Sequence, residues 1–150
     1  MSKKETLEML QKVSEVATLA GIRGMVDEDI LAFVASFEMP DNRSQVVFVR
    51  ITQATVKENH IIAFVSPCRR LKSGFLGGIS KSDAIDLLQR NEKLVLARYG
   101  IAKINDQDMV MASSDAILET LDPEEFEAHV WNVAIAAEAY EREKSTEDRF

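Results

Sequence analysis

The sequence predicts an α+β fold in which helices pack on an antiparallel sheet. Apolar residues recur with a helical period near both ends of the chain and once near its middle, and they alternate with polar residues in the segments between. These alternating segments follow one another across short polar turns, whereas a parallel sheet needs a long crossover between its strands. The expected element order is α-β-β-β-α-β-β-α. At 150 residues we expect a single domain, residues 1–150, with an ordered core over about residues 4–144.

The first helix is expected over residues 4–20. Ser2 and Glu5 have the spacing of a capping box, which satisfies free N–H groups at a helix start. Gly21 marks the end of the helix, because glycine adopts the left-handed cap conformation without strain from a Cβ atom. Between these signals, apolar residues recur every three or four positions and form one stripe: Leu7, Leu10, Val13, Ala17 and Ala20.

Three strands are expected next, over residues 30–39, 45–55 and 60–65, as an antiparallel meander. Turn-forming residues separate them at positions 40–42 and 57–59. Several residues on the second face of these strands are also apolar: Ile30, Ala32, Val34, Val46 and Phe48. Large exposed apolar patches usually mark binding surfaces, so this pattern leaves open whether the second face is buried or binds a partner.

A helix and a hairpin are expected after the third strand. Ser80 or Ser82 caps the helix, which runs to about Asn91. The hairpin has strands over residues 94–104 and 109–113, joined by four polar residues that favour a turn.

The final helix has more apolar surface than one contact with a sheet needs. It begins with Asp122 as its cap and Pro123 at its first position, and it runs to about Lys144. Between positions 128 and 137 it is apolar nearly all round. Such a helix is either deeply buried in its own domain or contacts a second surface, so both interpretations stay open.

Acidic residues are concentrated in the last third of the chain. Overall, 18 basic and 25 acidic residues give a net charge of −7. Residues 1–105 carry 15 basic and 12 acidic side chains, net +3, whereas residues 106–150 carry 3 and 13, net −10. The acidic run indicates either a solvated helix face or a negative surface that steers partners. The negative total argues against a general nucleic-acid binder, which needs a basic face.

The chain has a single cysteine, Cys68, which excludes an intramolecular disulfide and indicates a reducing, cytoplasmic environment. No apolar run has the length of a membrane span, and the polar N-terminal residues do not form the core of a signal peptide. With one cysteine and two histidines, no thiolate zinc site is expected, and no cofactor is predicted. Arg69 and Arg70 follow Cys68, so the thiol is either activated by positive charge or an ordinary thiol at a strand end.

No catalytic pattern is present, and we expect that the chain is not an enzyme. Residues 74–82 resemble a phosphate-binding loop only faintly, since Ser80 stands where the pattern needs glycine before Lys-Ser. Neither His60 nor His129 has a serine or cysteine partner that sequence spacing identifies. Three basic residues precede the glycines of this loop and are either candidate anion ligands or part of a solvated loop: Arg69, Arg70 and Lys72.

The element order of this small acidic chain resembles the type III secretion chaperone-like fold, which includes the Tir-chaperone type proteins and the YbjN-type bacterial sensory transduction regulators. The resemblance covers about residues 4–144. Its more sequence-like part is the C-terminal third, with LVLARY at residues 94–99, LDPEEF at 121–126 and AEAY at 137–140. This part is more similar to the YbjN-type branch than to a dedicated secretion chaperone.

The resemblance implies a non-enzymatic homodimer that binds another polypeptide, with chaperone-like or regulatory activity. The positions that match the partner-binding surface of the family are Leu7, Leu10, Phe33 and Val34. The positions that match its dimer contact are Ile85, Leu88 and Tyr99. A second class of function stays open, namely a small sensory or ligand-binding regulator that recognises an anionic metabolite through the loop at residues 69–78.

Overall fold

The computed structural model describes residues 1–74 and 77–144. In these residues three α-helices accompany a six-stranded antiparallel sheet of order β1-β2-β3-β4-β6-β5, which confirms the predicted α+β class. The elements are α1 (Lys3–Leu19), β1 (Met25–Asp27), β2 (Ala32–Met39), β3 (Arg43–Val56), β4 (Asn59–Arg70), α2 (Lys81–Asn91), β5 (Arg98–Ile104), β6 (Gln107–Ile117) and α3 (Pro123–Lys144).

Several strands depart from the sequence prediction. β4 continues through Pro67 to Arg70, so the predicted end of this strand at residue 65 was wrong. β1 is an additional strand that pairs with β2, and its three residues are too few to show alternation. β5 begins at Arg98 instead of residue 94. The side chain of Asn91 accepts from the backbone N–H of Tyr99 at 2.7 Å and donates to the Tyr99 carbonyl at 3.0 Å. These bonds tie the end of α2 to the start of β5, so residues 92–97 connect the two outside the sheet.

The turn between β5 and β6 is shorter than predicted. Asn105 and Asp106 both have positive φ, 48° and 61°, as a two-residue type I′ hairpin requires. Gln107 pairs with Ile104, and β6 extends to Ile117. The predicted four-residue turn was wrong because Gln107 and the residue after it belong to the strand.

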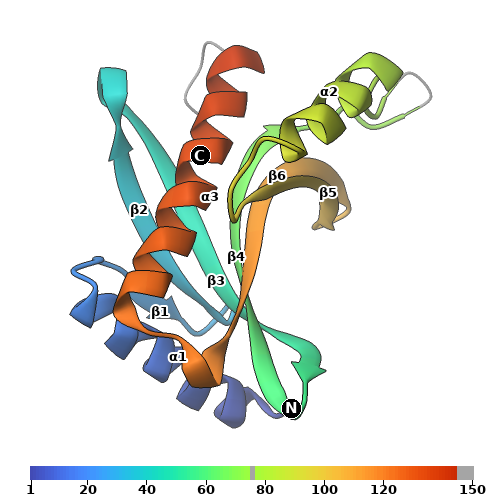
Figure 1. Ribbon diagram of the computed structural model, residues 1–150. Helices are drawn as coiled ribbons and strands as arrows, with labels where there is room; N and C mark the ends of the chain where they lie inside the picture. The colour runs from blue at the N-terminus through green and yellow to red at the C-terminus, as the bar shows by residue number, and fades with distance from the viewer. Residues whose placement is uncertain (75–76, 145–150) are drawn as a thin grey trace.

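All three helices lie on one side of the sheet (Figure 1). α3 runs along the sheet, α1 crosses near the β3–β4 turn, and α2 lies at the other end beside the last turn of α3 (Figure 1). In the core, Phe126 of α3 packs edge-on against Phe33 of β2 and Phe64 of β4, with ring centroids 6.1 and 5.4 Å apart. Leu10 and Val13 of α1 are fully buried in the same cluster. Among the described helices, none has the length and apolar character needed to cross a membrane.

The chain itself covers most of the apolar surface of α3. Trp131 packs on Phe37 of β2, with ring centroids 4.7 Å apart. The hydroxyl of Tyr99 donates to the carbonyl of Ala136 at 2.6 Å, on another side of the helix. Ile135 is the large apolar residue of α3 that stays mostly exposed. Packing within the chain therefore accounts for most of the apolar surface of α3, and only a small part of that surface is exposed.

The acidic run of the C-terminal third is not simply a solvated face, because two glutamates of α3 are buried. Glu138 accepts from Arg43 Nε at 2.5 Å, and Glu141 lies 3.4 Å from the same guanidinium. Gln45 donates to Glu141 at 2.6 Å, and its own amide oxygen accepts from the Ser66 hydroxyl at 2.9 Å. These residues form a polar network between α3 and the strands, which we call the Arg43 network.

Candidate functional site

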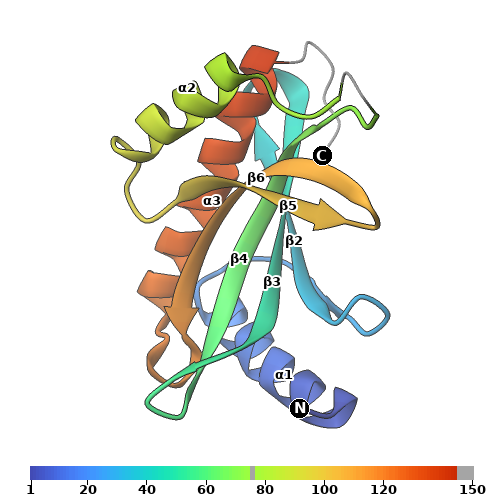
Figure 2. The same cartoon turned by 90° about the vertical axis from the view of Figure 1, so that its right-hand side faces the viewer.

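The face of the sheet opposite the helices is the main candidate for a binding surface. In the described residues no helix covers it, and the ends of β5 and β6 arch across it on the side away from α3 (Figure 2). Because side chains alternate along strands, the residues between the core positions point to this face. We call it the open face, and its central residues are Val34, Val46, Phe48, Val65, Pro67 and Met111.

The open face is concave. Neighbouring strands lie about 4.8 Å apart, and β4 and β6 stand between β3 and β5 in the sheet. Residues of β3 and β5 nevertheless line one groove, of about 360 Å³. The sheet must therefore curl toward the open face. A β-bulge in β4, where the register with β6 shifts between Pro67 and Arg69, contributes to this curl because bulges bend and twist a strand.

Pro67 lies in the central strand β4, directly before the bulge. Beside it, the Ser66 hydroxyl shares its single proton between the Val46 carbonyl at 2.7 Å and the Gln45 amide oxygen at 2.9 Å. A bulge is one of the places where a strand tolerates proline, because the regular hydrogen bonding is already interrupted there.

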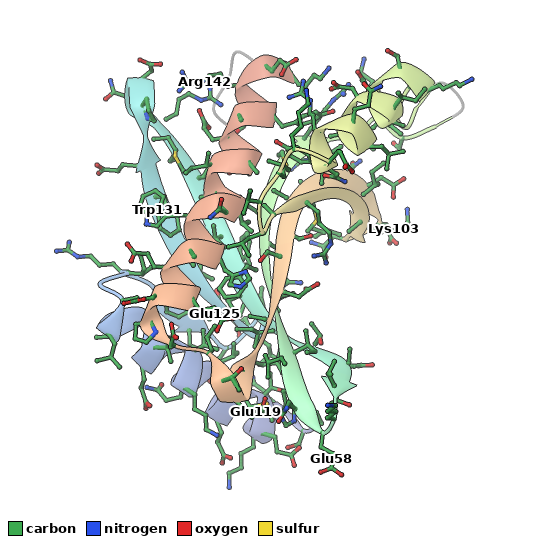
Figure 3. All side chains as sticks on the ribbon, in the orientation of Figure 1. Glu58, Lys103, Glu119, Glu125, Trp131 and Arg142 are labelled. Carbon is green, nitrogen blue, oxygen red and sulfur yellow. The ribbon has the colours of Figure 1, made fainter. Side chains whose placement is uncertain are left out.

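The groove has an apolar floor and a basic rim. The floor consists of Phe48, Val65, Pro67, Ala102, Ile104, Met109 and Met111, and the rim of Arg50 and Arg70. Lys103 also borders the groove, but it alternates along β5 with the floor residues Ala102 and Ile104 and forms an ion pair with Asp108 at 3.0 Å. The Arg50 guanidinium lies 5.9 Å from the centre of the Phe48 ring. Figure 3 shows Lys103 on the opposite side of the molecule from Trp131 of α3. Such a groove can accept apolar groups that carry negative charge.

The four positions that the resemblance assigned to partner binding do not lie on one surface in the structure. Val34 lies on the open face and is half-buried, and Leu7 is half-buried on α1. Leu10 and Phe33 are at most 1% exposed and belong to the core under α3. They point to the helix-covered side of the sheet, so a partner on the folded chain cannot contact them.

The three positions assigned to a dimer contact also differ in exposure. Ile85 and Leu88 on α2 are 45% and 70% exposed. Tyr99 is buried between α2 and α3, with its hydroxyl on the Ala136 carbonyl and its ring beside Tyr140. This burial raises the pKa of Tyr99 to about 12. The ring of Tyr99 therefore belongs to the core and is not available for a dimer contact.

The candidate anion ligands do not converge on one site. Arg69 points toward the helices, where it binds Asp83 at 2.8 Å and the Tyr140 hydroxyl at 3.4 Å. Its hydrogen bond lowers the pKa of Asp83. Arg70, the next residue, points the other way and lies on the groove rim. Lys72 is exposed in the loop, of which residues 75–76 lie outside the described residues.

Cys68 is buried at the bulge and is not an activated thiol. It is 2% exposed, and burial raises the pKa of its thiol. The adjacent arginines point to opposite sides of the sheet and do not lower that pKa. The activated-thiol interpretation therefore does not apply to the folded chain.

The structure brings together a serine, a histidine and a carboxylate that sequence spacing did not connect. Ser114 Oγ is hydrogen-bonded to His129 Nδ1, and His129 Nε2 lies 3.8 Å from Glu125. These are the residue types of a hydrolytic triad. Ser114, however, has no exposed surface, and the His129 ring is stacked on Phe64. A substrate cannot reach the hydroxyl, so the group satisfies buried polar atoms under α3.

A second histidine lies at the opposite end of the sheet from α2. His60 Nδ1 is 2.6 Å from Glu119, which also accepts from the His60 backbone N–H. Burial opposes ionisation of Glu119, but the hydrogen bonds from His60 outweigh it and lower the pKa of Glu119. A surface cavity beside His60 is lined by both polar and apolar residues, namely Met1, Glu5, Met9, Thr52, Gln53 and Thr55. The cavity holds no cysteine, and we find no activated nucleophile there.

No protein-family model matches the chain, and no curated protein matches it. Among the described residues, no group of three or more His, Cys, Asp or Glu side chains is placed to hold a metal ion. The candidate site therefore depends on the geometry of the open face. Three of its residues, Val34, Val46 and Phe48, could be identified from the sequence through the apolar second face of the strands, and Arg70 of the rim was among the candidate anion ligands. Met109, Met111 and Arg50 carried no such signal.

Proposed function

We propose that this protein binds another polypeptide on the open face and has no catalytic activity. One observation carries the proposal: an apolar, concave sheet face without a covering helix in the described residues. Contiguous apolar patches on a folded domain usually mark interaction sites. The resemblance to the chaperone-like fold supports the same function. On this proposal the protein is a cytoplasmic homodimer with a chaperone-like or regulatory role.

The proposal is tested by purifying the tagged protein gently from its own host and recording native mass spectra. We expect the wild-type protein to retain a second polypeptide. Val65→Glu places a charge on the open face and is expected to remove that polypeptide. Val34→Glu, on another strand of the face, repeats the test in case one variant folds poorly. Ile135→Glu on α3 is the matched control, because Ile135 is 58% exposed and lies away from the open face.

Circular dichroism and thermal unfolding of each variant establish that it is folded. Loss of the bound polypeptide in folded Val65→Glu, with retention in Ile135→Glu, supports the proposal. A wild-type protein that carries no polypeptide, or equal retention in all variants, contradicts it.

A small-ligand regulator is the second candidate function. It is favoured by the position of Arg70 on the rim of an apolar groove, without an ion pair in the described residues. It predicts that an anionic metabolite raises the unfolding temperature of the wild-type protein and that Arg70→Gln abolishes the shift. Absence of any shift across a broad panel of anions counts against this function.

A further inference from the structure

We infer that the groove on the open face selects partner segments in which apolar side chains are interspersed with carboxylates. This inference rests on the proposed function and adds the chemistry of the partner. It follows from the charge of the groove, the chemistry of its floor and the pairing of the arginines elsewhere in the chain.

The charge of the groove is opposite to that of the molecule. The chain has a net charge of −7, yet the groove rim carries Arg50 and Arg70, and no acidic residue is among the described residues that line the groove. Lys103 also borders the groove, but Asp108 pairs with it. An acidic surface repels acidic partners at long range, so a local basic rim gives such a partner one favourable place to dock.

The two arginines of the groove form no ion pair with the described residues, unlike most arginines of the chain. Five described arginines form ion pairs within the chain: Arg43, Arg69, Arg90, Arg98 and Arg142. Arg50 and Arg70 are exposed and form no ion pair with the described residues. The Arg50 guanidinium instead lies over the Phe48 ring, 5.9 Å from its centre. Both guanidinium groups therefore have N–H donors free for a carboxylate.

The apolar floor is suited to a range of side chains. Met109 and Met111 come from β6, and methionine adapts its shape because its side chain is unbranched and flexible. Phe48 and Val65 form the more rigid part of the floor. Met109 and Met111 are only 6% and 9% exposed, so a partner segment contacts mainly the half-buried Phe48 and Val65. These apolar contacts contribute affinity, and the rim supplies the discrimination between acidic and basic segments.

The experiment uses three labelled peptides with the same leucines and with glutamate, glutamine or lysine between them. Fluorescence anisotropy measures their binding to the full chain at low and at high salt. We expect the glutamate peptide to bind most tightly and the lysine peptide most weakly, and salt to reduce the difference. Arg50→Gln and Arg70→Gln each weaken binding of the glutamate peptide about two- to fivefold and leave the glutamine peptide nearly unchanged.

Arg23→Gln is the matched control. Arg23 is also exposed and without an ion pair to the described residues, but it lies between α1 and β1, away from the groove. The inference is overturned if Arg23→Gln has the same effect as the groove variants, or if the three peptides bind equally.

The two proposals fail in distinguishable ways. If all three peptides bind equally and Val65→Glu abolishes this binding, the preference for acidic segments is contradicted. The proposed binding of a polypeptide on the open face then still stands. Failure of all three peptides to bind also overturns the inference, and the native mass spectra then decide the function separately. Dodecanoate, a small probe with one carboxylate on an apolar chain, separates the two candidate functions. If dodecanoate binds and the Arg70→Gln variant also loses binding of the glutamate peptide, the result supports recognition of carboxylates by the groove. Binding of dodecanoate without binding of any peptide overturns the inference and favours the small-ligand regulator.

Discussion

His129 is a buried histidine, and its burial disfavours the protonated form of its ring. Its ring is stacked on Phe64, with centroids 5.1 Å apart, and its Nδ1 atom is hydrogen-bonded to Ser114. Burial lowers the pKa of His129, and the nearby carboxylates Glu125 and Asp115 offset this only in part. Protonation of the folded chain would place a charge next to an aromatic ring under α3.

We therefore predict that the protein loses stability as the pH falls below about 6.5. The unfolded chain takes up a proton on His129 near that pH, whereas the folded chain takes it up only at a lower pH. The stabilisation that comes from keeping His129 neutral is complete above the pKa of His129 in the unfolded chain. It is lost as the pH falls through the lower pKa of His129 in the folded chain. Urea unfolding at pH 5 to 8 measures this slope, and His129→Gln should flatten it. A slope that His129→Gln leaves unchanged would show that other groups cause it.

The Arg43 network ties α3 to the first long hairpin of the sheet. Arg43 lies within ion-pair distance of both buried glutamates, Glu138 and Glu141, and its side chain is only 11% exposed. Arg142 joins Glu138 to the neighbouring Asp41 from the surface side. The two glutamates lie three positions apart on α3, so one face of the last helical turns is held by charge instead of by apolar packing.

Replacing Arg43 by methionine is predicted to lower the free energy of unfolding by about 3–5 kcal/mol, because it leaves two buried carboxylates without their shared cation. Arg98→Met is the matched control. Its ion pair with Asp115 is largely exposed, at 53% and 41%, so its loss should cost less than about 1 kcal/mol. Urea denaturation compares the two variants. Equal costs would mean that the Arg43 network contributes no more than a surface ion pair.

The β3–β4 turn holds Lys57 and Glu58 at positive φ, 49° and 72°. Neither residue type favours the left-handed region, and each costs about 1 kcal/mol there. A Lys57→Asn and Glu58→Gly double variant introduces the preferred pair for a type I′ turn. We predict that it raises the free energy of unfolding by about 1–2 kcal/mol, measured by thermal unfolding. Unchanged or lower stability would show that the turn is not strained.

The elements could be predicted where their signals are local. The capping box of Ser2 and Glu5 is formed in the structure, as the sequence spacing indicated. The buried role of Glu138 could not be predicted, because its partner Arg43 is 95 residues away along the chain. The start of β5 was also missed, since it depends on a tie between the Asn91 side chain and the backbone of Tyr99.

At the scale of the whole molecule, the two faces of the sheet have different roles. One face is closed by the helices and holds the core, while the other is concave and open in the described residues. The sequence indicated apolar residues on both faces, but not the curl that makes the groove. The bulge at Cys68 contributes to the curl, and nothing about that residue type indicates a bulge.

The helix-side surface allows a separate test of the proposed homodimer. Ile85 and Leu88 lie three positions apart on α2, so they are neighbours on its exposed face. If this face forms the dimer contact, Leu88→Glu places an unpaired charge in it. We predict that the dissociation constant of the dimer then rises about a hundredfold or more.

Val65→Glu, on the open face, should leave the dimer intact, as should Leu19→Glu at the 77% exposed end of α1. Sedimentation equilibrium across a range of concentrations measures all three variants beside the wild-type chain. A wild-type monomer, or a dimer that dissociates in Val65→Glu and not in Leu88→Glu, would contradict the α2 contact. The second result would mean that two copies meet through their open faces, and a partner polypeptide would then have to compete with the second copy for the groove.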